Sequence, residues 1–435
     1  MSNRSLGFLG IVAALSVTSC NLDKNNPNAP TQSAIFGGRV GIVSLAIGLQ
    51  ARYGAGMSSF VFPGGLISDE FGAPAGALQS YKDAEAGALA DTYDAVELPW
   101  RSHYQTVKTA NDLIANAANV ELGDQTLSGI LSISYLLKGA SCGELVQQYQ
   151  QIILDPEAAS PVFVDRAAAL AGVMALLDSA LSQANKFPAR TEFDASIIAK
   201  GFSLKNTIYA MQARYQRLAG NWQAALAAAN AVDTSVVSVM PFSDQAVNPI
   251  YDVSVTYVRP RDTLRLAAET GDARVAFHIS GPTVQGNIRP LRSFTQFGTR
   301  TAPVPFYWPG EVMLIKAEAY ANTGQLALAA AQVNYVRTRC GGASNQPKAC
   351  LPALPAASLS TQSQILAEIY NQRKFELFAT GLRWEDVRRQ GLVSQTSAFA
   401  KRCWLLYPNS ERNTEPNVPA NPSNDPPQAP SRCGV

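Results

Sequence analysis

The chain has 435 residues, of which 47% are hydrophobic and only 16% charged, and its formal net charge is +2. A chain of this size can bury a large core and could hold two or three ordinary domains. The near-neutral charge gives no electrostatic reason to expect nucleic acid as a partner. The two histidines, His103 and His278, are far apart in the chain, and neither an HExxH nor a CxxC motif is present. We therefore expect no cofactor and no metal.

Residues 1–19 have the order of a secretory signal peptide: a basic residue, Arg4, then an apolar run, then small residues. The apolar run is too short to span a membrane as a stable helix. Cys20 follows directly, and Val17-Thr18-Ser19-Cys20 is similar to a bacterial lipobox, whose cysteine is acylated. We therefore expect a lipid anchor on Cys20. An ordinary cleaved signal followed by an incidental cysteine is the alternative.

Residues 20–35 are rich in Asn, Pro and Asp, cannot form a core, and predict a flexible leash. The leash would join the lipid anchor to one α-helical domain over residues 36–409. The end of the chain, residues 410–435, is dense in Asn and Pro and predicts an extended tail.

Export implies an oxidising environment, in which disulfides persist. Cys340 and Cys350 flank a loop that they could close, and Cys403 and Cys433 could hold the tail to the body. Cys142 lies in a helical pattern and is expected to be a small buried hydrophobic residue. Five cysteines also allow other pairings, and a metal site is the remaining alternative.

The body is predicted to be mainly α-helical. Residues 36–53 have helical spacing, and apolar residues at four/three spacing predict later helices that begin near Pro99, Leu131 and Val164. Two segments, Lys205–Val232 and Glu311–Arg339, place small residues and a glycine at the same offsets. Small residues let two antiparallel helices approach closely, which is the logic of tetratricopeptide (TPR) repeats. The sequence predicts a scaffold of TPR-like helix pairs, with long insertions and a few short strands.

Two insertions interrupt this pattern. Residues 57–94 are punctuated by Gly and Pro, which predicts loops and short helical turns. Residues 235–308 form the larger interruption of the helical pattern. Apolar residues at every second position from Tyr251 to Tyr257 predict a short strand or hairpin there. Insertions on a rigid scaffold are the usual place for recognition, although a structural cap over the core has about equal weight.

The C-terminal third has the most distinctive pattern. A long helix is predicted over Gln364–Thr380, Gly381 breaks it, and a short charged helix follows over Arg383–Gln390. The charges are placed to tie the two helices together, with these residues as a structural signature: Arg373, Glu376, Gly381, Arg383, Trp384 and Asp386. The adjacent acids Glu385 and Asp386 are more simply a solvated or ion-paired face than an acid–base pair.

Taken in order, these parts resemble the SusD/RagB family of outer-membrane nutrient-binding lipoproteins. The resemblance rests on Cys20 with its leash, on the helix of Trp100 and Asn111, on the hairpin from Trp308 to Arg339, and on the signature around Trp384. Gln372 and Thr380 depart from the glutamates that the family usually has at these places. The substitutions put detailed ion pairing in question more than the fold.

The resemblance implies a non-catalytic binding protein, anchored by lipid to the outer membrane at the cell surface. Such proteins capture oligosaccharides, or another oligomeric nutrient, and deliver them to a SusC-like TonB-dependent barrel. Aromatic rings stack on sugar faces while polar side chains bind the hydroxyls. We expect the ligand surface in the two insertions, at these residues: Asp69, Phe71, Tyr81, Tyr251, Tyr257 and Arg259. The alternatives are a structural or assembly helical-repeat protein of the cell envelope and, less favoured, a helical glycoside hydrolase.

Overall fold

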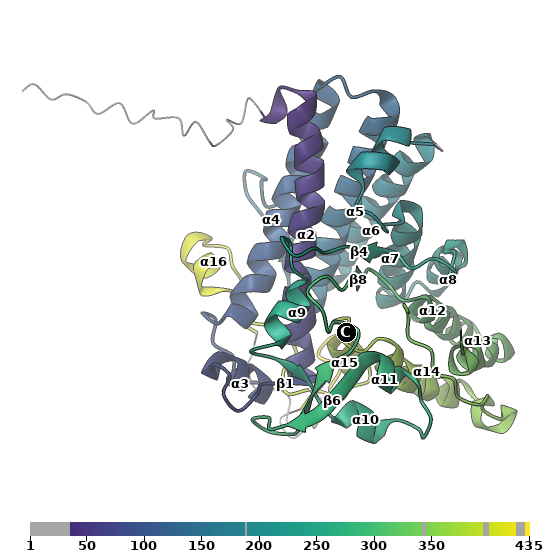
Figure 1. Cartoon of the computed structure of the whole chain (residues 1–435). Helices are drawn as coiled ribbons and strands as arrows, with labels where there is room; N and C mark the ends of the chain where they lie inside the picture. The colour runs from purple at the N-terminus through teal and green to yellow at the C-terminus, as the bar shows by residue number, and fades with distance from the viewer. Residues whose placement is uncertain (1–34, 188, 342–344, 395–399, 423–430) are drawn as a thin grey trace, which may run out of the picture.

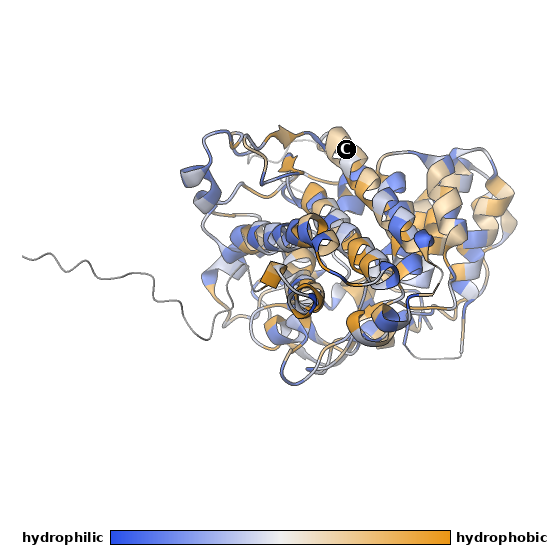
Figure 2. Ribbon diagram, turned by 90° about the horizontal axis from the view of Figure 1, so that it is seen from above, coloured by the Kyte–Doolittle hydropathy of each residue, from blue (hydrophilic) through white to orange (hydrophobic). Residues whose placement is uncertain are grey.

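The computed structural model describes residues 35–435 except 188, 342–344, 395–399 and 423–430 (Figure 1). The predicted signal peptide, Cys20 and the leash up to residue 34 lie outside the described residues. Helices dominate the described part, and the strands are few and short. Seen from above, hydrophobic and hydrophilic segments follow one another along the helices (Figure 2). The prediction of a mainly α fold built on TPR-like helix pairs is confirmed.

Four long helices form one half of the molecule: α2 (Arg39–Ile67), α4 (Asp94–Asn116), α5 (Asp124–Gln148) and α6 (Arg166–Lys186). Helix α2 packs against α4 and α5, and α6 packs against α5 and α7. Helix α6 is long and apolar enough to cross a membrane by length and composition alone. Its packing between two neighbours is that of a core helix.

The prediction of loops from residue 57 was wrong for its first part, because α2 continues to Ile67 through Pro63. A proline inside a helix lacks the N–H that would bind the carbonyl four residues earlier. Here the Gln148 side chain of α5 donates to the Ser59 and Phe60 carbonyls, at 3.2 and 3.1 Å. Almost the whole end of α2 is buried, so tertiary packing overrides the local Gly and Pro signal.

The helix pairs form the other half. Helices α7 (Leu204–Leu218) and α8 (Trp222–Ala231) make the first pair, and α12 (Pro309–Asn322) and α13 (Leu326–Thr338) make the second. Each pair turns at a glycine with positive φ, 75° at Gly220 and 78° at Gly324. Helix α14 (Gln362–Glu376) packs against α12 and α13, and their shared core includes Leu314, Val333 and Ile369.

The second insertion is a set of short elements on one side of this scaffold: β4 (Val239–Met240), α9 (Pro249–Ser254), β5 (Arg259–Pro260), α10 (Thr263–Ala267), α11 (Arg274–His278), β6 (Ile279–Val284), β7 (Leu291–Phe294) and β8 (Val304–Pro305). Strand β4 pairs with β8, and β6 pairs with β7, all antiparallel. The strand predicted over Tyr251–Tyr257 is wrong, because Tyr251 lies in α9. The Asn248 side chain caps this helix by accepting from the N–H groups of Ile250 and Tyr251, and Pro249 suits its first turn.

The remaining elements are small. They are β1 (Phe71–Gly72), α3 (Gln79–Ala86), η1 (Ala117–Asn119), β2 (Ile152–Ile153), β3 (Phe163–Val164), η2 (Phe193–Ile197), η3 (Ala356–Leu359), α15 (Arg383–Arg389) and α16 (Asn409–Thr414). Helix α16, in the predicted tail, is tied to α4 by hydrogen bonds from Ser410 to Glu97. The structure joins Cys340 to Cys350 and Cys403 to Cys433, and it buries Cys142 without a disulfide.

Buried ion pairs connect the C-terminal signature to the helix pairs. The Asp386 carboxylate accepts from Arg373 Nε at 2.7 Å and from Arg217 Nη2 at 3.1 Å. Burial alone would raise the pKa of Asp386, but Arg373 and Arg217 lower it to about 2. The signature therefore joins α14 and α15, as predicted, and it also reaches α7.

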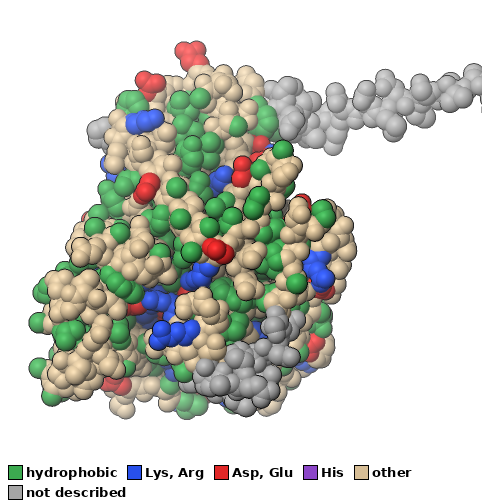
Figure 3. All heavy atoms as spheres, turned by 180° about the vertical axis from the view of Figure 1, so that it is seen from behind, with side chains coloured by type: hydrophobic (Ala, Val, Ile, Leu, Met, Phe, Trp, Pro, Cys, Tyr) green, Lys and Arg blue, Asp and Glu red, His purple; other side chains and the backbone are tan. Residues whose placement is uncertain are grey.

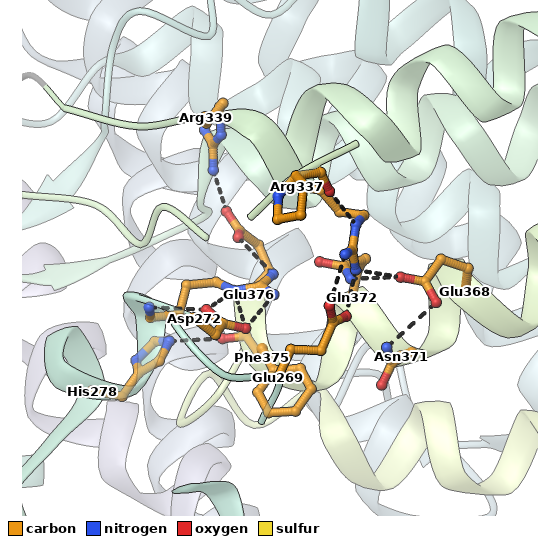
Figure 4. Close-up of polar contacts among 12 residues, drawn as sticks. Glu269, Asp272, His278, Arg337, Arg339, Glu368, Asn371, Gln372, Phe375 and Glu376 are labelled. Carbon is orange, nitrogen blue, oxygen red and sulfur yellow. Dashed lines mark hydrogen bonds and ion pairs between the residues drawn. The ribbon is translucent and has the colours of Figure 1, made fainter. Parts of the chain in front are cut away.

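Glu376 extends this network toward the second insertion. Its carboxylate binds Arg339 and lies 3.5 Å from Arg274 of α11, whose guanidinium is also held by Asp272 (Figure 4). Helix α14 ends here, earlier than the predicted Thr380, because the chain turns through Ala379 and Gly381 at φ of 61° and 81°.

Candidate functional site

The two insertions, far apart in sequence, meet in one place. Strand β1 of the first pairs with β5 of the second, with Phe71 opposite Pro260 and Gly72 opposite Arg259. Beside this pairing, the rings of Tyr81 on α3 and Tyr257 after α9 stack with centroids 5.1 Å apart and planes 4° from parallel. The structure thus brings together side chains that the sequence predicted only as two separate groups.

The stacked pair, which we call the tyrosine platform (Tyr81 and Tyr257), is half-buried and packs against the edge of the main hydrophobic core. Burial is the main cause of a raised Tyr81 pKa, with Asp94 adding to it, so the Tyr81 hydroxyl stays protonated at neutral pH. Arg259 is also half-buried, and its Nη1 lies 3.4 Å from Ser293 Oγ. Tyr93 donates to Asp83 of α3 at 2.8 Å. The region offers aromatic faces together with hydroxyl, guanidinium and carboxylate groups.

Two of the six predicted ligand residues have structural roles. Phe71 is fully buried and packs edge to face against Phe62 and Phe378, so assigning it to ligand contact was wrong. Asp69 has a positive φ of 66°, and its carboxylate forms an ion pair with Arg261 Nε at 2.8 Å and accepts a hydrogen bond from Arg289 Nη1 at 2.9 Å. An alternating or loop-like sequence pattern cannot distinguish a buried aromatic residue from an exposed one. The sequence therefore could not separate Phe71 from the half-buried tyrosines.

Tyr251, another of the six predicted ligand residues, is half-buried on α9.

Next to Asp69 lies a cavity of about 290 Å³ that the sequence did not predict. We call it the Glu70 pocket. It lies between the end of α2, α10, α14 and α15, and these residues line it: Ser68, Asp69, Glu70, Thr263, Leu264, Leu266, Ala267, Arg289, Lys374, Phe378 and Arg383. The only sequence signal was the acid pair Asp69-Glu70, whose partners on α10, α14 and α15 lie far along the chain.

A second cavity of about 370 Å³ lies where α7 and α8 meet α12, α14 and α15, and it contains Arg217, Arg373 and Arg389. Lys and Arg side chains gather in the lower half of the face opposite to that of Figure 1 (Figure 3). In this cavity, Glu318 accepts from Arg217 at 2.5 Å and from Arg389 at 3.0 Å. Because its arginines are largely committed to buried acids, we interpret this cavity as part of the scaffold.

The other candidates are structural. Glu385 is buried and pairs with Arg166 at 2.6 Å and Arg388 at 2.7 Å, so Glu385 and Asp386 form an ion-paired face but not a solvated one. Trp100, Trp308 and Trp384 are buried, whereas Trp222 is only half-buried. Among the described residues, no group of three His, Cys, Asp or Glu side chains is placed to hold a metal ion.

The fold and the sequence agree with known proteins. Residues 272–426 match the model of the SusD family. A SusD superfamily protein from Bacteroides thetaiotaomicron has 15% identity and a TM-score of 0.68, and the match covers 87% of this chain and 99% of that one. For one from Bacteroides fragilis the identity is 16% and the TM-score 0.68, over 88% and 99% of the two chains. A SusD-like carbohydrate binding protein from Bacteroides vulgatus has 12% identity and a TM-score of 0.67. That match covers 89% of this chain and 98% of the other.

At these identities the solved structures establish the fold, and the family model adds the match in sequence. A search of the curated proteins found no match to this chain. The scaffold of helix pairs with two insertions that pair through β1 and β5 is the architecture that defines this class of helical protein. The match over residues 272–426 and the shared fold agree with the resemblance to the SusD/RagB family that the sequence carries.

Proposed function

We propose that the protein is a non-catalytic, lipid-anchored outer-membrane protein that binds oligosaccharides and delivers them to a SusC-like TonB-dependent transporter. The observation that carries the binding proposal is the tyrosine platform at the meeting point of the two insertions. A pyranose ring has an apolar C–H face and polar edges, so it matches an aromatic face with neighbouring polar groups. The description of one solved SusD-like relative as carbohydrate-binding supports this proposal.

Replacing Tyr81 or Tyr257 by Ala should each weaken oligosaccharide binding about tenfold, which corresponds to about 1.4 kcal/mol. Each change removes one ring of the platform and leaves its partner without a stacking neighbour. Calorimetric titration of a panel of purified oligosaccharides measures the effect. Tyr335→Ala is the matched control, because Tyr335 is a half-exposed tyrosine on α13, outside both insertions.

The same experiment distinguishes the alternatives. Equal binding by both platform variants and the control would overturn the platform as the ligand surface. A protein that binds no oligosaccharide in the panel but still purifies with its barrel would favour the structural or assembly role. Shortened products after long incubation with a bound oligosaccharide would contradict the non-catalytic proposal.

Replacing Cys20 by Ala should release the protein from the membrane fraction, because the thiol that carries the acyl chains is lost. Stable anchoring depends on several acyl chains acting together. Immunoblotting of membrane and soluble fractions measures the change. Cys142→Ala, at a buried cysteine in α5, should stay in the membrane fraction. A Cys20→Ala variant that remains there as well would exclude the proposed anchor.

A further inference from the structure

The Glu70 pocket contains buried polar groups that lack partners. Ser68 Oγ, Glu70 Oε2 and Arg383 Nη1 have no hydrogen-bond partner, although their residues are only 3%, 6% and 6% exposed. A buried polar atom without a partner costs roughly 1–3 kcal/mol, so such atoms are rare unless something else satisfies them. Three of them line this one cavity, and Arg383, unlike the ion-paired arginines of the second cavity, forms no ion pair with a described acid, which together indicate a place that a ligand completes.

The charges of the pocket favour an anion. Asp69 is already neutralised by Arg261 and Arg289. Lys374 and Arg383 form no ion pair with any described residue, and the Arg383 guanidinium lies 4.7 Å from the centre of the Tyr370 ring. Burial raises the pKa of Glu70 to about 8, although Arg383 and Lys374 act against this rise and Asp386 adds to it. Glu70 is therefore mostly protonated at pH 7, and the negative charge that remains near Lys374 is that of Asp69, which Arg261 and Arg289 already pair.

The opposite wall is apolar and open to solvent at one point. Helix α10 contributes Leu264, which is buried, and Leu266, which is 68% exposed, and Phe378 lies behind them. The volume of about 290 Å³ is at the lower end of the roughly 300–1,000 Å³ usual for small-molecule sites. A ligand with one anionic end and one apolar face, about the size of a single sugar unit, fits these features.

We infer that the Glu70 pocket binds the carboxylate of an acidic sugar unit, such as a hexuronate. Arg383 and Lys374 would hold the carboxylate, and the Glu70 carboxyl group would donate to one of its oxygens. The C–H face of the sugar would lie against the α10 wall. This inference rests on the proposed function and names the class of sugar for it.

One arginine connects the Glu70 pocket to the tyrosine platform. Arg261 pairs with Asp69 in the lining of the pocket and with Glu85 on α3, the helix that carries Tyr81.

The test is calorimetric titration of the purified protein with glucuronate, glucose and inorganic sulfate. We expect glucuronate to bind at least tenfold more tightly than glucose, because only glucuronate carries the carboxylate. Lys374→Gln should weaken glucuronate binding about tenfold, and Lys374→Arg should restore most of it by keeping the charge. Lys316→Gln is the matched control, because Lys316 is also half-buried with a pKa lowered by burial, and it does not line the pocket.

Thermal unfolding of each variant shows whether it is folded, so that a loss of binding can be assigned to the pocket. Equal affinity for glucuronate and glucose, or an unchanged Lys374→Gln variant, would overturn the inference. Sulfate that competes as strongly as glucuronate would overturn the assignment to a sugar carboxylate. Loss of glucuronate binding in Lys374→Gln bears on the pocket, and loss of oligosaccharide binding in Tyr81→Ala or Tyr257→Ala bears on the platform, so failure of the two proposals gives different results.

Discussion

Replacing Asp386 by Asn should lower the free energy of unfolding by about 3–5 kcal/mol, which is the usual effect of breaking a buried ion pair. Asparagine has nearly the same shape, so packing is kept while the charge is lost. Arg373 and Arg217, both buried, would then face each other without the carboxylate that now separates and binds them. Because the pair joins α14 and α15 to α7, we expect the whole scaffold to be weakened.

Urea unfolding followed by circular dichroism measures this change. Asp112→Asn is the control, since Asp112 forms a partly exposed pair with Lys108 at 2.5 Å. Such pairs contribute roughly 0.2–1 kcal/mol. Similar losses for the two variants would show that the Asp386 network does not hold the scaffold.

The same network predicts how stability responds to acid. The folded pKa of Asp386 is lowered to about 2 from an ordinary value of 3.8. A lowered carboxyl pKa stabilises the fold above the unfolded value, and this contribution is lost as the pH falls through the folded value. The difference in stability between the parent protein and Asp386→Asn should therefore shrink as the pH falls from about 4 to 2.

Replacing Gly381 by Ala should cost about 2–5 kcal/mol, because two separate penalties add. The residue has φ of 81°, a left-handed conformation that costs an L-residue roughly 1–2 kcal/mol. A Cβ there would also lie 2.6 Å from the Phe60 ring and 3.1 Å from the Phe60 carbonyl oxygen. Overpacking of this kind typically costs a further 1–3 kcal/mol. Thermal and urea unfolding measure the sum.

Gly324→Ala separates the two penalties. Gly324 has nearly the same φ, 78°, but a Cβ there would meet nothing within 4 Å. We expect this variant to lose only the conformational part, about 1–2 kcal/mol. If both variants lost the same amount, Phe60 would have moved aside without cost, and the second penalty would be absent.

The hairpins and the signature were predictable because they depend on neighbours close in the chain. The small residues of α7, α8, α12 and α13, with a glycine between the members of each pair, specify antiparallel contact. The charges of α14 and α15 likewise lie within one short segment. Arg217 pairs with Asp386 of α15, and Arg274 lies beside Glu376 of α14. Both arginines come from distant parts of the chain, so the local sequence pattern could not identify them as partners.

The proposed ligand surface shows the opposite case, because it depends on contacts between distant parts of the chain. Six residues in two insertions were predicted, and the structure stacks Tyr81 on Tyr257 but buries Phe71 among other aromatic rings. Whether a ring is exposed depends on which strand pairs with β1, and that partner is β5, almost two hundred residues away. The Glu70 pocket depends on the same long-range contacts.

The sequence by itself determined the helical class of this protein, its helix pairs and its C-terminal signature, because periodicity, small residues and glycine turns act over a few residues. Only the tertiary structure decided that α2 runs through Pro63, that Tyr251 lies in a helix, and where the platform and the pocket form. These outcomes depend on burial by distant segments, such as the Gln148 side chain that satisfies the carbonyl groups beside Pro63. Burial of this kind is set by the whole fold and leaves no local pattern in the chain.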